Sequence, residues 1–516
     1  MLRPWQHVPT SELDQMLFDT LVPEDHYLRR VKTLLDFEAL RPILAERYPS
    51  ATGRPAVEPL LLLKLEFLEY HYNLSDRGVI NQAQVNMAYR FFLDLSLRSE
   101  LPHHTLLTYF RERLGRDQHQ RLFDAVVGQA RQHGLVKDRL RLKDATHMIA
   151  NIAIPSAVRL LAEMRQKLLA AVRPFAPERV AQEEAQAASI HTTTADLSGE
   201  ERLVQRVTHL RSIVAWVEDL VERGQPAGVD EPAWWVLTEV LQLAHKVLAD
   251  REPKAVDQLV SFQDQDARKG NHHGPYVGYL FDMTMDGDSE IITAVNVLPA
   301  SGDEVKDGTT LIEQEEQAHG NDVQAMSIDG IGFRGDALRE WTDPHGLNLE
   351  VIVPPRTEPP VLGFTVDQFT LDATEERVTC PAGQTSQRRV RNRQDTGWSY
   401  RFARGVCAAC PLLSQCMAEL PRTRGRQVST NDYAAEYAAA RAKAETPEYE
   451  EVRRQHWRVE RKLNEIVRWH RGRRARYRGR PRLRIQGLLT GLVVNIKRLV
   501  RHLLAPKVRA EVVASG

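Results

Sequence analysis

The stretch LRLKDATHMIA, residues 140–150, decides the fold that this sequence predicts. Its apolar positions are Leu140, Leu142, Met148 and Ile149. Their pattern predicts a β-strand that packs on a hydrophobic core. Asp144 interrupts the strand with a carboxylate, and burying a carboxylate costs free energy unless another group compensates its charge. The stretch therefore predicts a sheet-based core and raises the question of what compensates Asp144.

Further strands are indicated well downstream of this first one. Residues 276–299, YVGYLFDMTMDGDSEIITAVNVLP, are rich in β-branched and aromatic residues, and the Asp-Gly pair at 286–287 predicts a hairpin turn. DVQAMSID at 322–329 and LEVIVPP at 349–355 predict two shorter strands. Because helix-period sequence lies before, between and after these strands, we predict a mixed α/β core that is interrupted by insertions.

The chain of 516 residues is long enough for several domains. Residues 1–139 have helical periodicity, which predicts an N-terminal helical domain; that this domain binds DNA is what the family resemblance described below implies. A connection of about a hundred residues without strands predicts an inserted helical subdomain. The predicted parts are an N-terminal domain at 1–139, a catalytic core at 140–155, 255–356 and 431–516, a helical insertion at 156–254, and a cysteine-containing insertion at 357–430.

The formal net charge is zero, but the charges are unevenly distributed along the chain. Residues 468–484, RWHRGRRARYRGRPRLR, hold nine arginines and no acidic residue. Such a block can be a solvated tail, yet arginine with interleaved aromatic residues is also typical of phosphate contact. The sequence lacks a secretory signal and an apolar run long enough to span a membrane. We therefore expect a cytoplasmic, nucleoid-associated protein that acts on nucleic acid and not on membranes.

Two further acidic residues accompany Asp144. Asp329 follows an apolar run and precedes a glycine in MSIDGIGFRGD, and Glu460 lies in the predicted helix RVERKLNE. Each has an ordinary structural explanation, because Asp-Gly pairs form turns, aspartate caps helices, and exposed glutamates form ion pairs. Together, the three carboxylates are the ligands that a pair of Mg²⁺ ions needs for attack on a phosphodiester.

The order LKDAT, SIDGIGF and VERKLNEIVRWHRGRRARYRG resembles the catalytic acids of bacterial insertion-sequence transposases with a DDE domain. The resemblance extends upstream to GRPAVEPLLLLKLEFLEYHYNLSDRGVINQAQVNMAYRFFLDLSL and LPHHTLLTYFRERLG, which look like the helical domain of one large group of these enzymes. It implies an RNase H-like fold with Asp144 on the first strand, Asp329 on or beside the fourth strand and Glu460 on a later helix. It also implies two Mg²⁺ or Mn²⁺ ions, double-stranded DNA as transposon ends and target, and a homodimer in the synaptic complex.

The sequence departs from the family pattern near two of the three acids. Members commonly carry Ala-Asp followed by Gly-Tyr at the second acid, where this chain has Ser-Ile-Asp-Gly-Ile-Gly-Phe around Asp329. Related groups place a basic residue seven positions after the glutamate, where this chain has Val467, so Arg468 is its expected substitute. Glu465 is an alternative third acid. It lies five residues after Glu460 and therefore on a different helix face.

All four cysteines of the chain fall between residues 380 and 416. The residues are Cys380, Cys407, Cys410 and Cys416. A pair with two intervening residues is half of a typical zinc site, and four thiolates suit tetrahedral Zn²⁺. Buried free thiols and a redox pair are the alternatives. We predict a structural zinc site, and similar cysteine-bearing inserts occur in the family that this chain resembles.

Candidate DNA contacts come mainly from the arginine-rich block. The predicted contacts are Arg468, Arg471, Arg473, Arg474, Arg476 and Arg478. Trp398 alternates with Tyr400 and Phe402, and we expect these rings either to form a small core around the metal or to stack a DNA base. Trp234 and Trp235 are weaker candidates for stacking, and the pair His272 and His273 is expected in an exposed loop.

These observations favour a transposase that binds terminal inverted repeats, cleaves DNA strands with Mg²⁺ and joins them to a target. An alternative is a DNA-binding or regulatory protein that is derived from a transposase and has an inactive or repurposed catalytic site. A third possibility is a nuclease without strand transfer. The sequence does not identify the inverted repeat, the target preference or the excision route.

Overall fold

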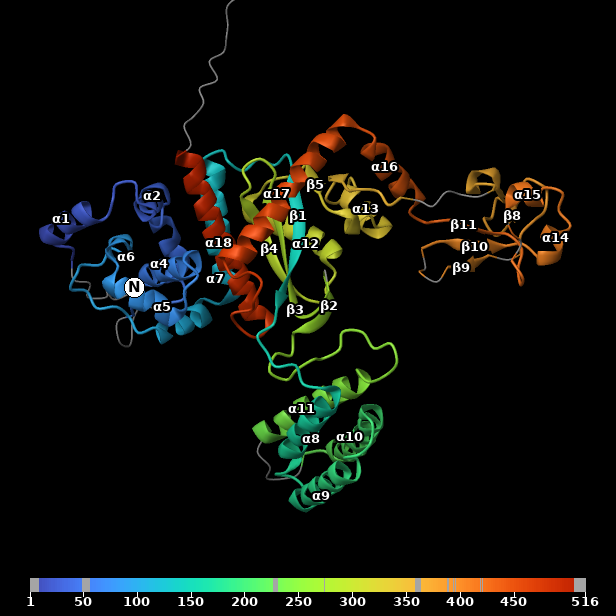
Figure 1. Cartoon of the computed structure of the whole chain (residues 1–516), viewed down its shortest axis with the longest axis horizontal. Coiled ribbons are helices and arrows are strands. Elements are labelled where there is room, and N and C mark those ends of the chain that lie inside the picture. Colours follow the sequence, from blue (N-terminus) through green and yellow to red (C-terminus); the bar gives the residue numbers. More distant parts are fainter. Residues whose placement is uncertain are drawn as a thin grey trace, which may run out of the picture.

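A computed structural model of the chain describes residues 9–48, 56–225, 231–272, 274–357, 363–387, 389–392, 394, 396–417, 419 and 421–504. A mixed sheet lies at the centre, with a lobe of N-terminal helices on one side of it (Figure 1). A helical lobe and a small cysteine-containing lobe project from the sheet in two other directions.

The central sheet combines antiparallel and parallel strands. Its strands are β1 (Arg141–Ile149), β2 (Arg268–Asn271), β3 (Pro275–Asp286), β4 (Ile292–Pro299), β5 (Ala325–Ser327) and β6 (Glu350–Ile352). Strand β3 pairs antiparallel with β1, β2 and β4, whereas β1 pairs parallel with β5 and β5 parallel with β6. The main order across the sheet is therefore β4-β3-β1-β5-β6. The hairpin predicted at residues 286–287 connects β3 and β4 and is confirmed.

Alternation along β1 sends its side chains to two differently covered faces of the sheet. Leu142 shares a face with Asp144 and belongs to the same hydrophobic cluster as Val459 and Leu463 of α17 (Pro447–Trp469). On this face α18 (Arg480–Leu504) lies against β3 and β4, where Gly487 allows close contact with Phe281. The opposite face, which Lys143 occupies, is covered by α12 (Glu304–His319).

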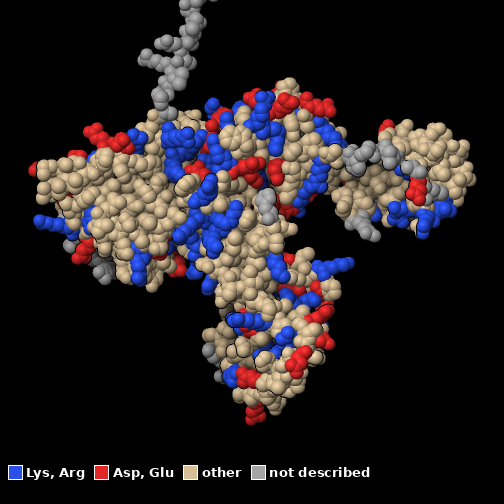
Figure 2. All heavy atoms as spheres, in the orientation of Figure 1, with Lys and Arg blue, Asp and Glu red and all other residues tan. Residues whose placement is uncertain are grey.

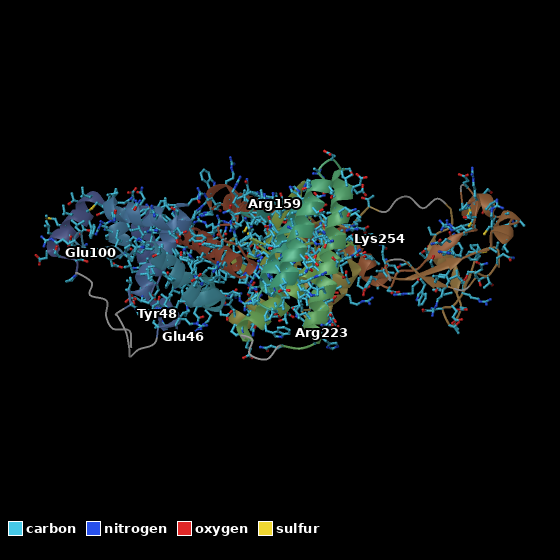
Figure 3. The ribbon with its side chains drawn as sticks, turned by 90° about the horizontal axis from the view of Figure 1, so that it is seen from below. Glu46, Tyr48, Glu100, Arg159, Arg223 and Lys254 are labelled. Atoms are coloured by element: carbon cyan, nitrogen blue, oxygen red, sulfur yellow. The ribbon has the colours of Figure 1, made fainter. Side chains whose placement is uncertain are left out.

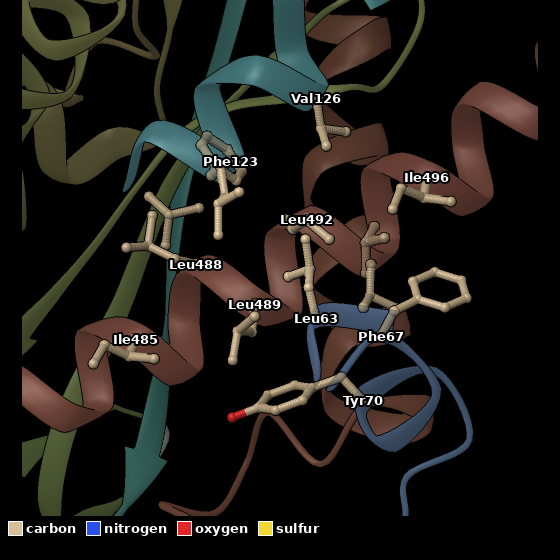
Figure 4. Close-up of a cluster of buried hydrophobic side chains, with 14 of the residues drawn as sticks. Leu63, Phe67, Tyr70, Phe123, Val126, Ile485, Leu488, Leu489, Leu492 and Ile496 are labelled. Carbon is tan, nitrogen blue, oxygen red and sulfur yellow. The ribbon is translucent and has the colours of Figure 1, made fainter. Parts of the chain in front are cut away.

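The N-terminal helices share one hydrophobic core with the sheet and with α18. These elements are α1 (Glu12–Leu21), α2 (Tyr27–Leu34), η1 (Glu38–Leu40), α3 (Arg41–Ala45), α4 (Pro59–His71), α5 (Asp76–Val85), α6 (Met87–Phe92) and α7 (Thr105–Gln132). Helix α4 is buried on nearly every side, which agrees with its apolar sequence. Figure 4 shows Leu489 and Leu492 of α18 in the same cluster as Leu63 of α4 and Phe123 of α7.

The segment between β1 and β2 forms a helical lobe with its own hydrophobic core. Its helices are α8 (Ala157–Val172), α9 (Pro177–Thr193), α10 (Gly199–Glu222) and α11 (Glu231–Ala249). Viewed from below in Figure 3, this lobe covers the middle of the molecule, with Arg159 and Arg223 on its surface. Its core residues, such as Leu168 and Ile213, belong to a cluster that is separate from that of the sheet.

The remaining elements lie beyond β5 in the chain. They are η2 (Gly330–Gly332), α13 (Gly335–Thr342), η3 (Val366–Gln368), β7 (Thr370–Leu371), β8 (Val378–Thr379), β9 (Val390–Arg391), β10 (Trp398–Arg401), α14 (Arg404–Ala408), α15 (Leu413–Cys416), β11 (Gln427–Ser429) and α16 (Ala434–Ala444). We call residues 363–429 the cysteine lobe. It has a small core of its own around Tyr400 and Phe402.

The sequence predicted a mixed α/β core with a helical N-terminal region, and the structure confirms this fold class. One detail differs from the expectation. Asp329 follows the fifth strand of the chain and not the fourth, because the short strand β2 precedes β3. Among the described helices, none is both long and apolar enough to cross a membrane.

Candidate active site and nucleic-acid surface

The parallel pairing of β1 and β5 brings two of the predicted acids to neighbouring positions, one on β1 and one just after the end of β5. Leu142 pairs with Ser327, so the register continued by two residues places Asp144 level with Asp329. The half-buried Asp144 carboxylate accepts a hydrogen bond of 2.8 Å from the amide N–H of Ala145. The sheet topology thus makes neighbours of two residues that are far apart in the sequence.

The electrostatic environment of Asp144 opposes its ionisation. Burial raises the pKa of the Asp144 carboxyl to about 7. The Ala145 N–H and the Lys143 ammonium oppose this rise, whereas the carboxylates of Asp329 and Glu304 add to it. Lys143 does not pair with Asp144, because it points to the opposite face and donates to both oxygens of Asp282 at 2.8 and 2.9 Å.

Asp329 lies in the loop that follows β5, where its carboxylate accepts a hydrogen bond of 3.2 Å from the N–H of Ile331 and caps η2. In the same loop, Arg334 binds both oxygens of Asp303 at 2.9 and 2.8 Å. This ion pair brings the first turn of α12 to the Asp329 loop. Burial raises the pKa of Glu304 in that turn, and Asp329 adds to the rise.

Glu304 is a carboxylate of this region that the sequence analysis did not single out. It follows the helix-capping Asp303, which is an ordinary place for an acidic residue in a first turn. Its nearness to Asp329 depends on the Arg334 ion pair across two elements, and the sequence pattern carries no signal for that contact.

Helix α17, which carries Glu460, is attached to the end of β5 by two side chains. Arg453 donates a hydrogen bond of 3.1 Å to the carbonyl oxygen of Ile328, directly before Asp329. Nδ1 of the buried His456 lies 3.1 Å from the Ser327 hydroxyl. Burial and the nearby Arg453 lower the pKa of His456 to about 4, so this imidazole is neutral. The two contacts orient the helix relative to the Asp329 loop.

Glu460 and its alternative, Glu465, lie on different sides of α17. At about 100° per residue, Glu460 lies within roughly 40° of both Arg453 and His456, the residues that contact β5. Glu465 lies about 140° away from Glu460 and accepts hydrogen bonds from Lys462 at 3.2 Å and from Lys497 at 2.7 Å. Although burial opposes ionisation, these lysines lower the pKa of Glu465 to about 2. Glu465 is thus held in ion pairs, whereas Glu460 is exposed.

The described residues contain no group of three or more His, Cys, Asp or Glu side chains with the spacing of metal ligands. Neither the three predicted acids nor the four cysteines form such a group. Asp329 is close enough to raise the pKa of Asp144, and Glu460 does not complete a three-carboxylate cluster with the two aspartates. The tetrahedral zinc site predicted from the cysteines is likewise not supported at this spacing.

The four cysteines nevertheless lie together in the cysteine lobe. They line one small cavity of about 30 Å³. The Cys407 sulfur accepts a hydrogen bond of 3.3 Å from the amide N–H of Arg426. Burial raises the pKa of the Cys416 thiol, the Arg426 guanidinium opposes this rise, and the other three sulfurs add to it. The chain thus gathers all of its thiols at one place, where they are half-buried and form no disulfide.

The predicted DNA-binding arginines fall into two groups. Those with exposed side chains are Arg468, Arg471, Arg474 and Arg478. Arg473 instead donates to the Thr146 hydroxyl at 3.1 Å and to the His147 carbonyl at 2.8 Å. Arg476 donates to Glu69 at 2.8 Å and to the Leu74 carbonyl at 2.9 Å. In Figure 2, Lys and Arg side chains gather on the side of the molecule where α17, α18 and their connection lie.

The aromatic candidates occupy three different environments. Trp398 packs against the core of the cysteine lobe, and the Arg389 guanidinium lies 4.0 Å from its ring centroid, so a DNA base could stack there only after displacing a neighbour. Trp234 packs in the helical lobe with Phe175, and Trp235 is exposed. His272 is half-buried next to His147, and the prediction for His273 lies outside the described residues.

Two family models match the chain, and both describe transposases. A transposase domain, DUF772, matches residues 16–113, which contain most of the N-terminal helices. A transposase DDE domain matches residues 379–500, which include the cysteines, Glu460 and most of α18. In both regions the chain is similar to DDE-type transposases of insertion sequences.

The matched DDE region contains Glu460 but neither Asp144 nor Asp329. The assignment of the two aspartates to the same site therefore depends on the strand register and on the effect of Asp329 on the pKa of Asp144. No solved structure matches the chain. The DDE domain implies that the chain uses a divalent metal ion, typically Mg²⁺.

Proposed function

We propose that the chain is a transposase that binds double-stranded DNA at the ends of its element, cleaves the strands there, and joins the 3′ ends to target DNA by transesterification. In this proposal its core is RNase H-like, and Asp144, Asp329 and Glu460 are the catalytic carboxylates. The order β4-β3-β1-β5-β6 supports the proposal, because one acid lies on the central strand and the second follows the parallel strand beside it.

The observation that carries the proposal is the electrostatic situation of Asp144. Its half-buried carboxyl lies near the carboxylates of Asp329 and Glu304, while the adjacent Lys143 is bound to Asp282 on the other face. Within the described residues, no Lys or Arg side chain forms an ion pair with Asp144, and oxygen ligands of this kind fit Mg²⁺ or Mn²⁺. A pair of these ions, when bound, polarises the phosphodiester and activates the attacking hydroxyl.

Residues of the chain itself orient the third carboxylate and the DNA. Arg453 and His456 attach α17 to the end of β5, so the side of the helix that carries Glu460 is turned toward the Asp329 loop. The exposed Arg468 and Arg478 are placed to contact phosphates, which makes DNA binding strongly dependent on salt. A synaptic complex joins two DNA ends, so the proposal includes a homodimer on DNA.

The test uses a duplex that carries the sequences flanking the gene, with purified protein in Mg²⁺ or Mn²⁺. We expect the wild type to nick this duplex and the Asp144→Asn variant to lose at least about 10³-fold in cleavage rate while its Kd for the duplex changes less than about two-fold. Asp288→Asn, an acidic residue of the β3–β4 turn, is the matched control, and it keeps the wild-type cleavage rate.

The outcome also separates the alternatives. A wild type that binds the duplex but never cuts it in either metal would support a regulatory protein with a repurposed site. Cutting without joining of the 3′ ends to a second duplex would support a nuclease.

We also propose that the cysteine lobe binds a structural Zn²⁺ ion through Cys380, Cys407, Cys410 and Cys416. The shared cavity of the four sulfurs supports this proposal, and so does the N–H group of Arg426, which donates to Cys407 as amides do to thiolates. Because the sulfurs do not lie at ligand spacing, the proposal requires a small adjustment of the lobe when the ion binds.

A further inference from the structure

A pocket of about 470 Å³ lies where the N-terminal helices meet the sheet. Its walls come from the first turn of α5, from residues 149–151 after β1, and from residues 471–477 between α17 and α18. We call it the seam pocket. Its volume lies within the range of roughly 300–1,000 Å³ that is usual for sites of small ligands.

The seam pocket has a rigid frame. Backbone hydrogen bonds of 2.9 Å run from the Ile149 N–H to the Arg473 carbonyl and from the Ala475 N–H to the Ile149 carbonyl, so this segment extends the sheet beside β1. The Arg473 and Arg476 side chains then fasten the segment to β1 and to the N-terminal helices. The pocket is therefore preformed by the fold.

The rim of the pocket carries an excess of positive charge. Arg77, Arg471 and Arg474 line it with exposed side chains, and within the described residues their guanidinium groups donate to no protein group. Its two acids are already compensated. Asp76 accepts from Arg111 at 2.5 Å, and Glu69 accepts from Arg111 and from Arg476.

Arg471 also has a left-handed backbone conformation, with φ of 53°. Non-glycine residues rarely adopt this conformation, and it tends to occur at functional sites. At this position it forms the turn that follows α17 and leads into the pocket-lining segment.

One part of the pocket lining, which we call the floor, is apolar. It consists of Leu74, Ile149, Ala150 and the ring of Tyr477. Ile149 ends the first strand with 37% of its surface exposed, so an apolar side chain is left open to a ligand. A second cavity, of about 390 Å³, continues on the other side of Asp76 and Tyr477 and is lined by Arg116 and Arg482. The two cavities therefore adjoin at Asp76 and Tyr477, which line both of them.

We propose that the seam pocket binds one unstacked nucleotide of a DNA strand. In this arrangement the arginine rim holds the phosphate and the apolar floor receives the base. A fully paired duplex presents only its backbone to such a concave site, whereas an extrahelical nucleotide offers both a phosphate and a flat apolar face. The inference rests on the proposed DNA binding and adds a specific site to it.

The experiment measures fluorescence anisotropy with a labelled 30-base-pair duplex and with the same duplex carrying one extrahelical 2-aminopurine. We expect the wild type to bind the bulged duplex about ten-fold more tightly than the paired one. We also expect the 2-aminopurine emission to change on binding. Ala150→Trp, which fills the pocket without changing charge, should remove this preference and leave binding to the paired duplex unchanged.

Two further variants separate the rim from general electrostatics. The double change Arg471→Ala and Arg474→Ala should reduce binding of the bulged duplex more than binding of the paired duplex. Arg468→Ala, which lies outside the pocket, should weaken both duplexes equally. Circular dichroism and thermal melting check that each variant is folded.

The outcomes distinguish this inference from the proposed function. If the wild type binds paired and bulged duplexes equally, the inference is wrong while DNA binding stands. If an abasic bulge binds as tightly as 2-aminopurine, the pocket reads only phosphate and the inference is also wrong. Failure to bind either duplex overturns both proposals.

Discussion

At the scale of single residues, the arginines that follow α17 divide between two tasks. Arg473 and Arg476 use their hydrogen bonds to join the C-terminal segment to β1 and to α4. Arg471 and Arg474, which are exposed, remain available for phosphate. Arginines within a few positions of one another therefore either stabilise the junction or add positive charge to its surface. Only their tertiary contacts distinguish the two roles.

The choice of third acid leads to a prediction at this scale. Glu460→Gln should lower the cleavage rate at least about 10³-fold and leave the free energy of unfolding nearly unchanged, because Glu460 is exposed. Glu465→Gln should do the reverse. It weakens the ion pairs with the buried Lys462 and with Lys497 and should cost about 1–2 kcal/mol of stability.

Cleavage assays and urea unfolding of the two variants provide the measurement. The assignment of Glu460 fails if Glu460→Gln still cuts at the wild-type rate, or if the loss of cutting follows the Glu465 variant while that protein remains folded.

A second residue-scale prediction concerns pH and His470. This imidazole is buried between the Tyr70 carbonyl, 3.1 Å from Nδ1, and the Lys497 ammonium, 3.0 Å from Nε2. Burial and the nearby Lys497 ammonium together lower the pKa of His470 to about 4, so the folded protein keeps the ring neutral. The unfolded chain takes up this proton near pH 6.5, which means that stability falls as the pH drops from 6.5 toward 4.

Because of His470, the free energy of unfolding should fall by about 2 kcal/mol between pH 7 and pH 5. His470→Gln can keep both hydrogen bonds but cannot take up the proton, so its unfolding free energy should fall less over this range. Urea titrations at both pH values test the difference, and the exposed His345→Gln serves as control. Equal pH slopes for wild type and His470→Gln would contradict the prediction.

At the scale of elements, α17 owes its orientation to contacts on two sides. Arg453 and His456 attach one side to β5, while Lys462 and Glu465 form ion pairs on another side. Between them, Val459, Leu463 and Ile466 pack on the sheet. The apolar stripe was readable as a helix pattern, but the rotation of the helix on the sheet follows from these specific partners.

The cysteine lobe carries a prediction at the element scale. Its apolar core is small, so a bound metal would supply much of its stability. We expect about one equivalent of zinc in the purified wild type, and less than about 0.2 equivalents in the Cys407→Ser and Cys410→Ser double variant. Metal analysis of the full chain measures both values.

Limited proteolysis can show whether the cysteine lobe loses its fold when zinc is removed. Chelation should make residues 363–429 sensitive to cleavage while the central sheet remains intact, because the core of this lobe is separate from that of the sheet. A metal-free wild type whose lobe resists the protease would remove the zinc proposal.

At the scale of the whole molecule, α18 connects the two matched transposase regions. It packs on β4 and at the same time on α4 and α7, so the N-terminal helices and the sheet belong to one hydrophobic cluster (Figure 4). The helical lobe, by contrast, has a cluster of its own. The molecule is therefore built as a fused body with appended lobes.

This difference leads to a prediction about stability. Leu492→Ala, at the centre of the shared cluster, should cost about 2–5 kcal/mol and lower the unfolding midpoint of the N-terminal helices and the sheet together. Tryptophan fluorescence and circular dichroism should therefore give coincident transitions for this body. Separate transitions would show that the N-terminal helices fold independently.

Removal of the helical lobe tests the converse. Replacing residues 156–254 by a short Gly-Ser linker should leave the remaining protein folded, with a melting midpoint within a few degrees of the wild type. Deletion of residues 9–48, which contribute to the shared cluster, should instead give an aggregated or unfolded product.

The sequence alone was sufficient for features that depend on local patterns. Alternation and turn residues predicted β1 and the hairpin at residues 286–287, and apolar periodicity predicted the helical regions before and after the sheet. The resemblance to insertion-sequence transposases, which both family matches support, came from short motifs around the acids and in the N-terminal helices.

Other properties were decided only by the tertiary structure, because they depend on contacts between residues that are hundreds of positions apart. The parallel register of β1 and β5 makes Asp144 a neighbour of Asp329, and the Arg334 ion pair adds Glu304. Packing of α18 places the N-terminal helices and the sheet in one hydrophobic cluster. Burial and pairing are non-local quantities, so a linear pattern can nominate charged residues, but only the fold assigns their partners.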